Sequence, residues 1–70
     1  MDKSHQDELL SNWLELNKTL MILEEEEILA LMEREKSQRA RLRVMMRLYH
    51  RFSRLRSQRE KREMGANAKA

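Results

Sequence analysis

The sequence predicts an all-α protein, an antiparallel two-helix hairpin that assembles into a helical bundle or docks on a partner. Three observations predict it. Apolar residues recur at helical spacing in two segments, period-2 alternation is absent, and the 70 residues include one Gly and no Pro. Apolar residues make up 40% of the chain and charged residues 39%, a mixture typical of helices with one apolar and one solvated face.

The first segment is expected to form an acidic amphipathic helix over residues 7–35. Residues 1–6 form its lead-in, and Ser4 is the candidate N-cap. At about 100° per residue its apolar side chains fall on one broad face, wider than the seam of a two-helix pair requires. The seam itself follows 4, 3, 4, 3 spacing, through Leu9, Trp13, Leu16, Leu20 and Leu23.

The second segment is expected to form a basic amphipathic helix over residues 39–63. Its apolar residues fall on one side of the helix: Leu42, Val44, Met45, Leu48, Tyr49, Phe52 and Leu55. Of these, Met45, Leu48, Phe52 and Leu55 follow 3, 4, 3 spacing. The apolar pattern stops after Leu55, and the segment 64–70 has little to bury. We therefore expect the helix to fray at Gly65 and the tail to be disordered.

The link between the two segments is polar from Glu33 to Arg39 and contains no helix breaker. Ser37 is the best candidate for a turn or N-cap residue, so the turn is expected at residues 36–38. One long continuous helix is the alternative. The hairpin is favoured because the two segments have similar lengths and opposite charges.

Charge is divided between the halves of the chain. Residues 1–36 contain ten acidic and four basic residues, a net charge of −6, whereas residues 37–70 contain two acidic and eleven basic residues, a net charge of +9. Folding at residues 36–38 would lay the acidic helix against the basic helix. Such a division also suits a basic half that holds a polyanion.

Two helices of this length bury too little apolar surface to offset the conformational entropy lost on folding. We therefore expect the hairpin to bind itself, as a dimer or higher oligomer, or a protein with an acidic surface. The leading hypothesis is a small non-enzymatic helical interaction, adaptor or assembly protein. Its candidate protein interface consists of Leu9, Trp13, Leu16, Leu20, Met21, Ile28, Leu31, Met45, Leu48 and Phe52.

The second half is rich in arginine, which favours bidentate contacts with carboxylates and phosphates. The alternative hypothesis is therefore a nucleic-acid-binding protein that uses the Arg-rich second helix. The candidate contacts to a polyanion or an acidic partner are Arg43, Arg47, Arg51, Arg54, Arg56, Arg59 and Arg62.

The run Glu24 to Glu27 is the most conspicuous acidic feature. On the helical wheel Glu24 and Glu27 fall inside the apolar arc and are expected to meet arginines of the facing helix, while the two residues between them are solvated. His5 and His50 lack metal-ligand spacing. No nucleophile motif or Gly-rich phosphate loop is present, so we expect no catalytic residues, no metal and no cofactor.

In size and layout the chain looks like small helical-hairpin proteins that viruses and plasmids encode as assembly factors or host-directed adaptors, an analogy of architecture without a shared motif. The longest uninterrupted apolar stretches are Leu20 to Leu23 and Ile28 to Met32, far short of the roughly 20 residues of a membrane span. We expect no membrane span and a cytoplasmic location, inside a host cell if the protein is viral.

Overall fold

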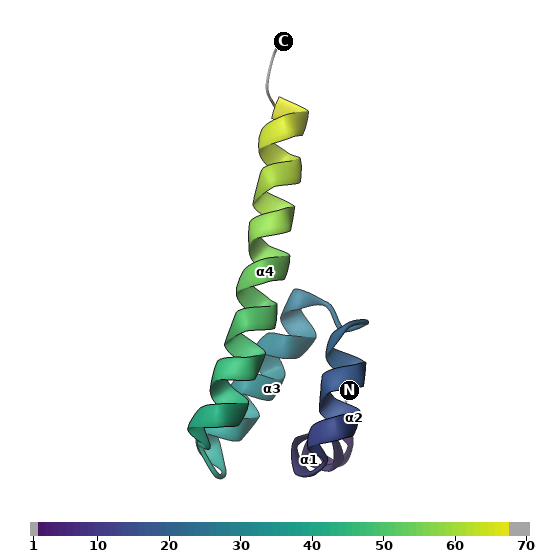
Figure 1. Cartoon of the computed structure of the whole chain (residues 1–70), viewed down its shortest axis with the longest axis vertical. Coiled ribbons are helices and arrows are strands. Elements are labelled where there is room, and N and C mark those ends of the chain that lie inside the picture. The colour runs from purple at the N-terminus through teal and green to yellow at the C-terminus, as the bar shows by residue number, and fades with distance from the viewer. Residues whose placement is uncertain (1, 68–70) are drawn as a thin grey trace.

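Four helices make up the fold, in a computed structural model that describes residues 2–67. They are α1 (Lys3–Ser11), α2 (Trp13–Leu20), α3 (Glu25–Ser37) and α4 (Leu42–Asn67). The described residues contain no strand, which confirms the all-α prediction. Figure 1 shows α4 as the long axis of the molecule, with its C-terminal half extending past the other helices. The molecule is accordingly elongated, 47 Å by 20 Å by 19 Å.

The single helix expected over residues 7–35 is wrong, because the chain leaves the helical conformation twice. Asn12 is extended, with φ −126° and ψ 97°, and its Oδ1 accepts a hydrogen bond from the Glu15 amide at 3.1 Å. The segment 21–24 then separates α2 from α3, and Glu24 is also extended. Both residues act as N-caps, satisfying amide groups that a helix start leaves without partners. Three short helices therefore replace one rod.

The start of the chain also differs from the prediction. Helix α1 begins at Lys3, inside the expected lead-in, and its N-cap is Asp2, whose Oδ1 accepts a hydrogen bond from the His5 amide at 2.8 Å. Ser4 lies within the helix and is not the N-cap. An aspartate carboxylate at this position also interacts favourably with the positive end of the helix dipole.

The link between α3 and α4 excludes the continuous-helix alternative and moves the turn. Residues 38–41 connect the helices, rather than the expected 36–38, and Ser37 is the last residue of α3. Ala40 adopts a left-handed conformation with φ 49°, and its amide donates to the Glu35 carbonyl at 2.7 Å. This geometry resembles the left-handed end that commonly terminates a helix.

Helix α4 begins three residues later than expected, at Leu42, and continues past the expected end at residue 63 as far as Asn67. Gly65 lies inside the helix. Of the tail expected at 64–70, residues 64–67 are thus helical, and 68–70 lie outside the described residues.

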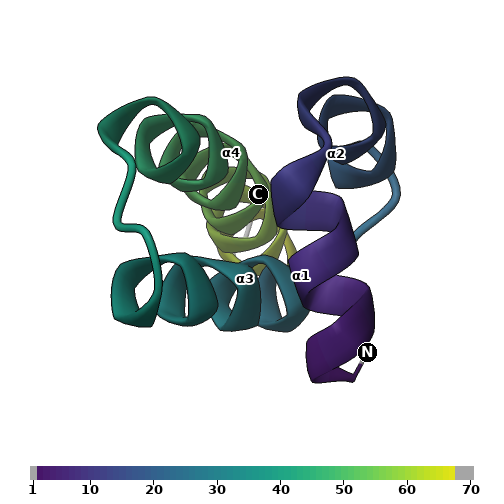
Figure 2. The ribbon, with the colours of Figure 1, turned by 90° about the horizontal axis from the view of Figure 1, so that it is seen from below.

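The fold is more than a two-helix hairpin. Helices α3 and α4 lie side by side and run in opposite directions, while α1 packs against both α2 and α3 (Figures 1 and 2). The core formed between them contains nine buried apolar residues, Leu9, Leu10, Leu16, Leu20, Leu23, Ile28, Leu31, Val44 and Leu48. Each helix contributes at least two of them, so the core depends on all four.

Candidate functional site

The ten apolar residues predicted as a protein interface divide into two groups. Six of them lie in the core of the chain itself, where their apolar surface is already used: Leu9, Leu16, Leu20, Ile28, Leu31 and Leu48. Of the other four, Trp13 and Met21 are exposed, whereas Met45 and Phe52 are partly buried. The broad apolar face of the first segment therefore folds largely onto itself.

Three of the predicted arginine contacts hold α2 against α4. The Arg43 guanidinium lies over the Trp13 ring, 4.3 Å from its centroid. One turn further along α4, Arg47 Nε donates to the Asn17 side-chain oxygen. These two contacts place guanidinium groups at the start and the middle of α2.

Arg51 completes this row at the C-terminal end of α2. Its Nε donates to the Leu20 carbonyl at 3.0 Å, and its Nη2 donates to the Met21 carbonyl at 3.3 Å. The last carbonyls of a helix lack partners within it and carry a partial negative charge, which a guanidinium satisfies well. Arg51 thus caps α2 from a different helix.

A basic groove lies where α2 ends beside α4. It has a volume of about 490 Å³ and is lined by Met21, Arg47, His50, Arg51, Arg54 and Gln58. Three arginines and a histidine line this groove, and no carboxylate of the described residues does. Arg54 and His50 are exposed at its edge. We call this surface the basic groove.

Two of the remaining predicted arginines lie among acidic groups. Arg56 Nε forms an ion pair with Glu60 Oε1 at 2.9 Å, within α4. Arg59 bridges two elements, because its Nε contacts Glu25 Oε1 at 2.9 Å and its Nη1 contacts Glu63 Oε1 at 3.0 Å. These two arginines are thus partly neutralised by carboxylates.

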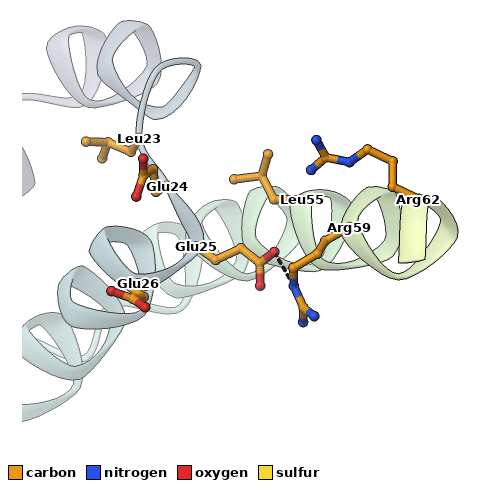
Figure 3. A pocket seen from close by; sticks show the side chains of 7 residues that line it. All are labelled: Leu23, Glu24, Glu25, Glu26, Leu55, Arg59 and Arg62. Carbon is orange, nitrogen blue, oxygen red and sulfur yellow. Dashed lines mark hydrogen bonds and ion pairs between the residues drawn. The ribbon is translucent and has the colours of Figure 1, made fainter. Parts of the chain in front are cut away.

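Figure 3 shows a second groove, of about 570 Å³, at the point where α4 leaves the bundle. Leu23 and Leu55 form its apolar part, the start of α3 supplies the carboxylates of Glu24, Glu25 and Glu26, and α4 supplies Arg59 and Arg62. The ion pair between Arg59 and Glu25 crosses it and ties the start of α3 to α4. This groove therefore holds both acidic and basic groups, in contrast to the basic groove.

The prediction for the acidic run is wrong in its assignment of residues. Glu24 and Glu27 do not meet arginines of a facing helix but form a capping box, each side chain bonding the backbone amide of the other. Glu25, expected in solvent, is the member that pairs with an arginine, Arg59. Of the two residues expected in solvent, Glu26 is exposed and Glu25 is partly buried. The broken helix changes the wheel positions and so explains the difference.

The prediction that Leu42 and Tyr49 share the apolar side of Leu48 is wrong, because they belong to a separate apolar row on the outer side of α4. Leu42, Met46 and Tyr49 are 73%, 48% and 56% exposed and follow 4, 3 spacing, opposite the buried Val44 and Leu48. We call these three residues the outer row. The 4, 3 spacing of the outer row is present in the sequence. The neighbouring row from Met45 to Leu55 is longer, however, and by itself predicts the apolar side of the helix.

Within residues 2–67, no group of three or more His, Cys, Asp or Glu side chains is arranged to hold a metal ion. No helix of the described part is long and apolar enough to cross a membrane. Comparison of the chain with protein-family models, with curated proteins and with solved structures finds no match.

Proposed function

We propose that this chain is a small non-enzymatic helical assembly protein that pairs with a second copy of itself through the outer row of α4. The observation that carries the proposal is the exposure of Leu42, Met46 and Tyr49 on the side of α4 opposite the buried Val44 and Leu48. A row of large apolar side chains at 4, 3 spacing is the pattern with which one helix packs lengthwise on another.

The size of the core supports this proposal. The described residues bury nine apolar side chains in the core and leave nine other large ones exposed to water. A domain of 70 residues has little stability to spare, and contiguous exposed apolar surface commonly marks an interaction site. Association that covers the outer row would add hydrophobic stabilisation that the single chain lacks.

The spacing along α4 favours a second copy as the partner. Beyond the outer row, the same side of the helix continues through Ser53, Arg56 and Glu60 at spacings of 4, 3 and 4. In an antiparallel pair centred on Ser53, the outer row of each copy faces the polar continuation of the other. The small Ser53 side chains at the centre would allow close approach of the two helices.

In this register Met46 lies opposite Glu60, and the two ends of the outer row meet chemically compatible groups. Tyr49 of each copy lies opposite the segment around Arg56 of the second copy, where a guanidinium can stack on the phenol ring. Leu42 lies opposite Met64, which is itself exposed. Both ends of the outer row therefore meet a suitable partner, and the interface is isologous, as closed dimers require.

Multi-angle light scattering of the purified chain tests the proposal. We expect a mass twice that of one chain at micromolar concentration, and Met46→Glu should reduce it to the mass of one chain because it places a carboxylate in the centre of the outer row. A matched control is Ile22→Glu, which adds the same charge at a residue that is 81% exposed between α2 and α3. This variant should remain dimeric.

A wild-type chain that is monomeric and stably helical at these concentrations would refute self-association. An equal loss of dimer in both variants would show that added charge, rather than the outer row, controls the mass. Circular dichroism of each variant establishes that the helices remain formed.

A further inference from the structure

We propose that the basic groove binds the phosphate backbone of a nucleic acid. The groove lies between the C-terminal end of α2 and the middle of α4 and is lined by Arg47, His50, Arg51 and Arg54. It belongs to a single chain and lies on a different side of α4 from the outer row. The inference therefore goes beyond the proposed assembly function and does not depend on it.

The positive charge of this groove is not neutralised. In the part of the chain that the structure describes, Arg47 and Arg51 bond only neutral oxygens, those of the Asn17 amide and the Leu20 and Met21 carbonyls. No ion pair joins either arginine to a carboxylate among residues 2–67. By contrast, Arg34, Arg41, Arg56 and Arg59 all contact carboxylates.

The segment that contains the groove residues of α4 has no acidic residue over a long stretch. Residues 36–59 contain nine lysines and arginines and no Asp or Glu. The first acidic residue after the groove is Glu60, whose carboxylate pairs with Arg56 on another side of α4. Local positive potential is therefore retained along the groove, and it would attract an anion.

The arginines that line the groove are also held in place. Hydrogen bonds to α2 and the residue after it fix the guanidinium groups of Arg47 and Arg51, yet each group has five N–H donors and uses only one or two here. The others remain for a ligand. A side chain that is already ordered loses less entropy on binding, which raises affinity. Arg54, at the exposed edge, adds a third guanidinium suited to bidentate contacts with phosphate.

The spacing favours a polymer of regularly spaced phosphates over other anions. Arg47, His50, Arg51 and Arg54 lie on one side of a straight helix from residue 47 to residue 54, about 10 Å at about 1.5 Å per residue. A nucleic-acid strand rises about 3.4 Å per nucleotide, so this row spans about three of them. An anionic membrane would instead favour apolar side chains among the basic ones, and Met21 is the single apolar residue that lines the groove in the described chain.

Fluorescence anisotropy with a labelled single strand of about 20 nucleotides and the corresponding duplex tests the inference. We expect both to bind at low salt, because recognition is through the phosphates. Neutralisation of about three to four phosphates predicts a roughly 40- to 150-fold loss of duplex affinity between about 50 and 200 mM salt. Absence of binding at the lower salt concentration would overturn the proposal.

A pair of matched variants locates the site. Arg54→Gln removes one exposed positive charge from the groove, and Lys36→Gln removes one exposed positive charge from α3, outside it. We expect roughly five- to tenfold weaker binding for Arg54→Gln, a salt slope reduced by about 0.9, and a change of less than about twofold for Lys36→Gln. Equal losses in the two variants would overturn the groove as the site.

Anionic vesicles and a monomeric variant separate the remaining explanations. Vesicles containing phosphatidylserine replace the nucleic acid in a sedimentation assay, and tight binding of vesicles without binding of either oligonucleotide would overturn the proposal. The monomeric variant Met46→Glu, tested on the same oligonucleotides, should still bind, since each groove is complete within one chain. Failure of self-association is thereby distinguishable from failure of the groove.

Discussion

Arg41 encloses the carboxylate of Glu35, the one charged side chain that is buried among the described residues. Arg41 donates from its backbone amide at 3.1 Å, from Nε at 2.8 Å and from Nη2 at 3.2 Å, using both carboxylate oxygens. The same Nη2 donates to the Leu10 carbonyl at 2.7 Å. This pair therefore joins the end of α3, the start of α4 and the end of α1.

Removal of one partner of this pair should destabilise the fold strongly. Glu35→Ala leaves the Arg41 guanidinium without its carboxylate, and loss of one member of a buried pair typically costs about 3 to 5 kcal/mol. Because Arg41 is partly exposed, we expect the lower end of that range. Urea unfolding followed by circular dichroism measures it. Glu33→Ala, at an exposed position of the same helix, should change stability by less than about 0.5 kcal/mol.

Acid should weaken the fold through two carboxylates. Hydrogen bonds from Arg41 lower the pKa of Glu35, and hydrogen bonds from Arg34 lower the pKa of Asp7. Each group binds its proton less readily in the folded chain, so its stabilisation is complete above the unfolded pKa values of about 4 and is lost as pH falls through the folded values. We expect the urea midpoint to be constant from about pH 7 to 5 and to fall below about pH 4. In Glu35→Ala the fall should be smaller, and an unchanged acid profile in that variant would contradict the assignment.

Ala40→Gly should stabilise the protein or leave it unchanged. Ala40 adopts φ 49°, where a Cβ atom costs about 1 to 2 kcal/mol that glycine does not incur. Part of this gain is offset by the greater entropy of glycine in the unfolded chain, so we expect a net gain of up to about 1 kcal/mol. Thermal unfolding measures it, with Ala40→Val as the comparison. A more stable valine variant would contradict the left-handed conformation.

Asn12→Ala should weaken α2. The Asn12 side chain caps this helix by accepting from the Glu15 amide, and replacement of such a cap by alanine costs about 1 kcal/mol. Asn12→Asp should retain the cap. A decrease in stability measured by urea unfolding for alanine alone supports the break at residue 12, whereas equal stability of both variants would contradict it.

The helical class and much of the core were predictable from the helical spacing of the apolar residues. This spacing persists within each short helix even where the chain leaves the helical conformation between them. Six of the ten predicted interface residues are indeed buried between helices, although those helices belong to the same chain. Periodicity alone does not distinguish a seam between chains from a core within one chain, because both bury the same side of a helix.

The breaks at Asn12 and Glu24 have a signal in the sequence. Asn12 precedes Glu15 and Glu24 precedes Glu27, each with the three-residue spacing of a capping box. The absence of Gly and Pro at these points favours a continuous helix, whereas the caps and the gain from burying several short helices determine the structure. The neutral partners of Arg47 and Arg51 could not be predicted, because they depend on α2 folding back along α4.

Disulfide crosslinking through Ser53→Cys tests the proposed pairing of α4 most directly, since the native chain contains no cysteine. In the antiparallel register the two introduced thiols meet at the twofold axis, within the roughly 7 Å between Cα atoms that a disulfide can span. Two residues at position 57 would be separated by about 12 Å along the helices, so Ser57→Cys is the matched control. We predict rapid formation of a covalent dimer by Ser53→Cys and little by Ser57→Cys under mild oxidation. Equal crosslinking of both variants, or none by Ser53→Cys, would contradict the pairing.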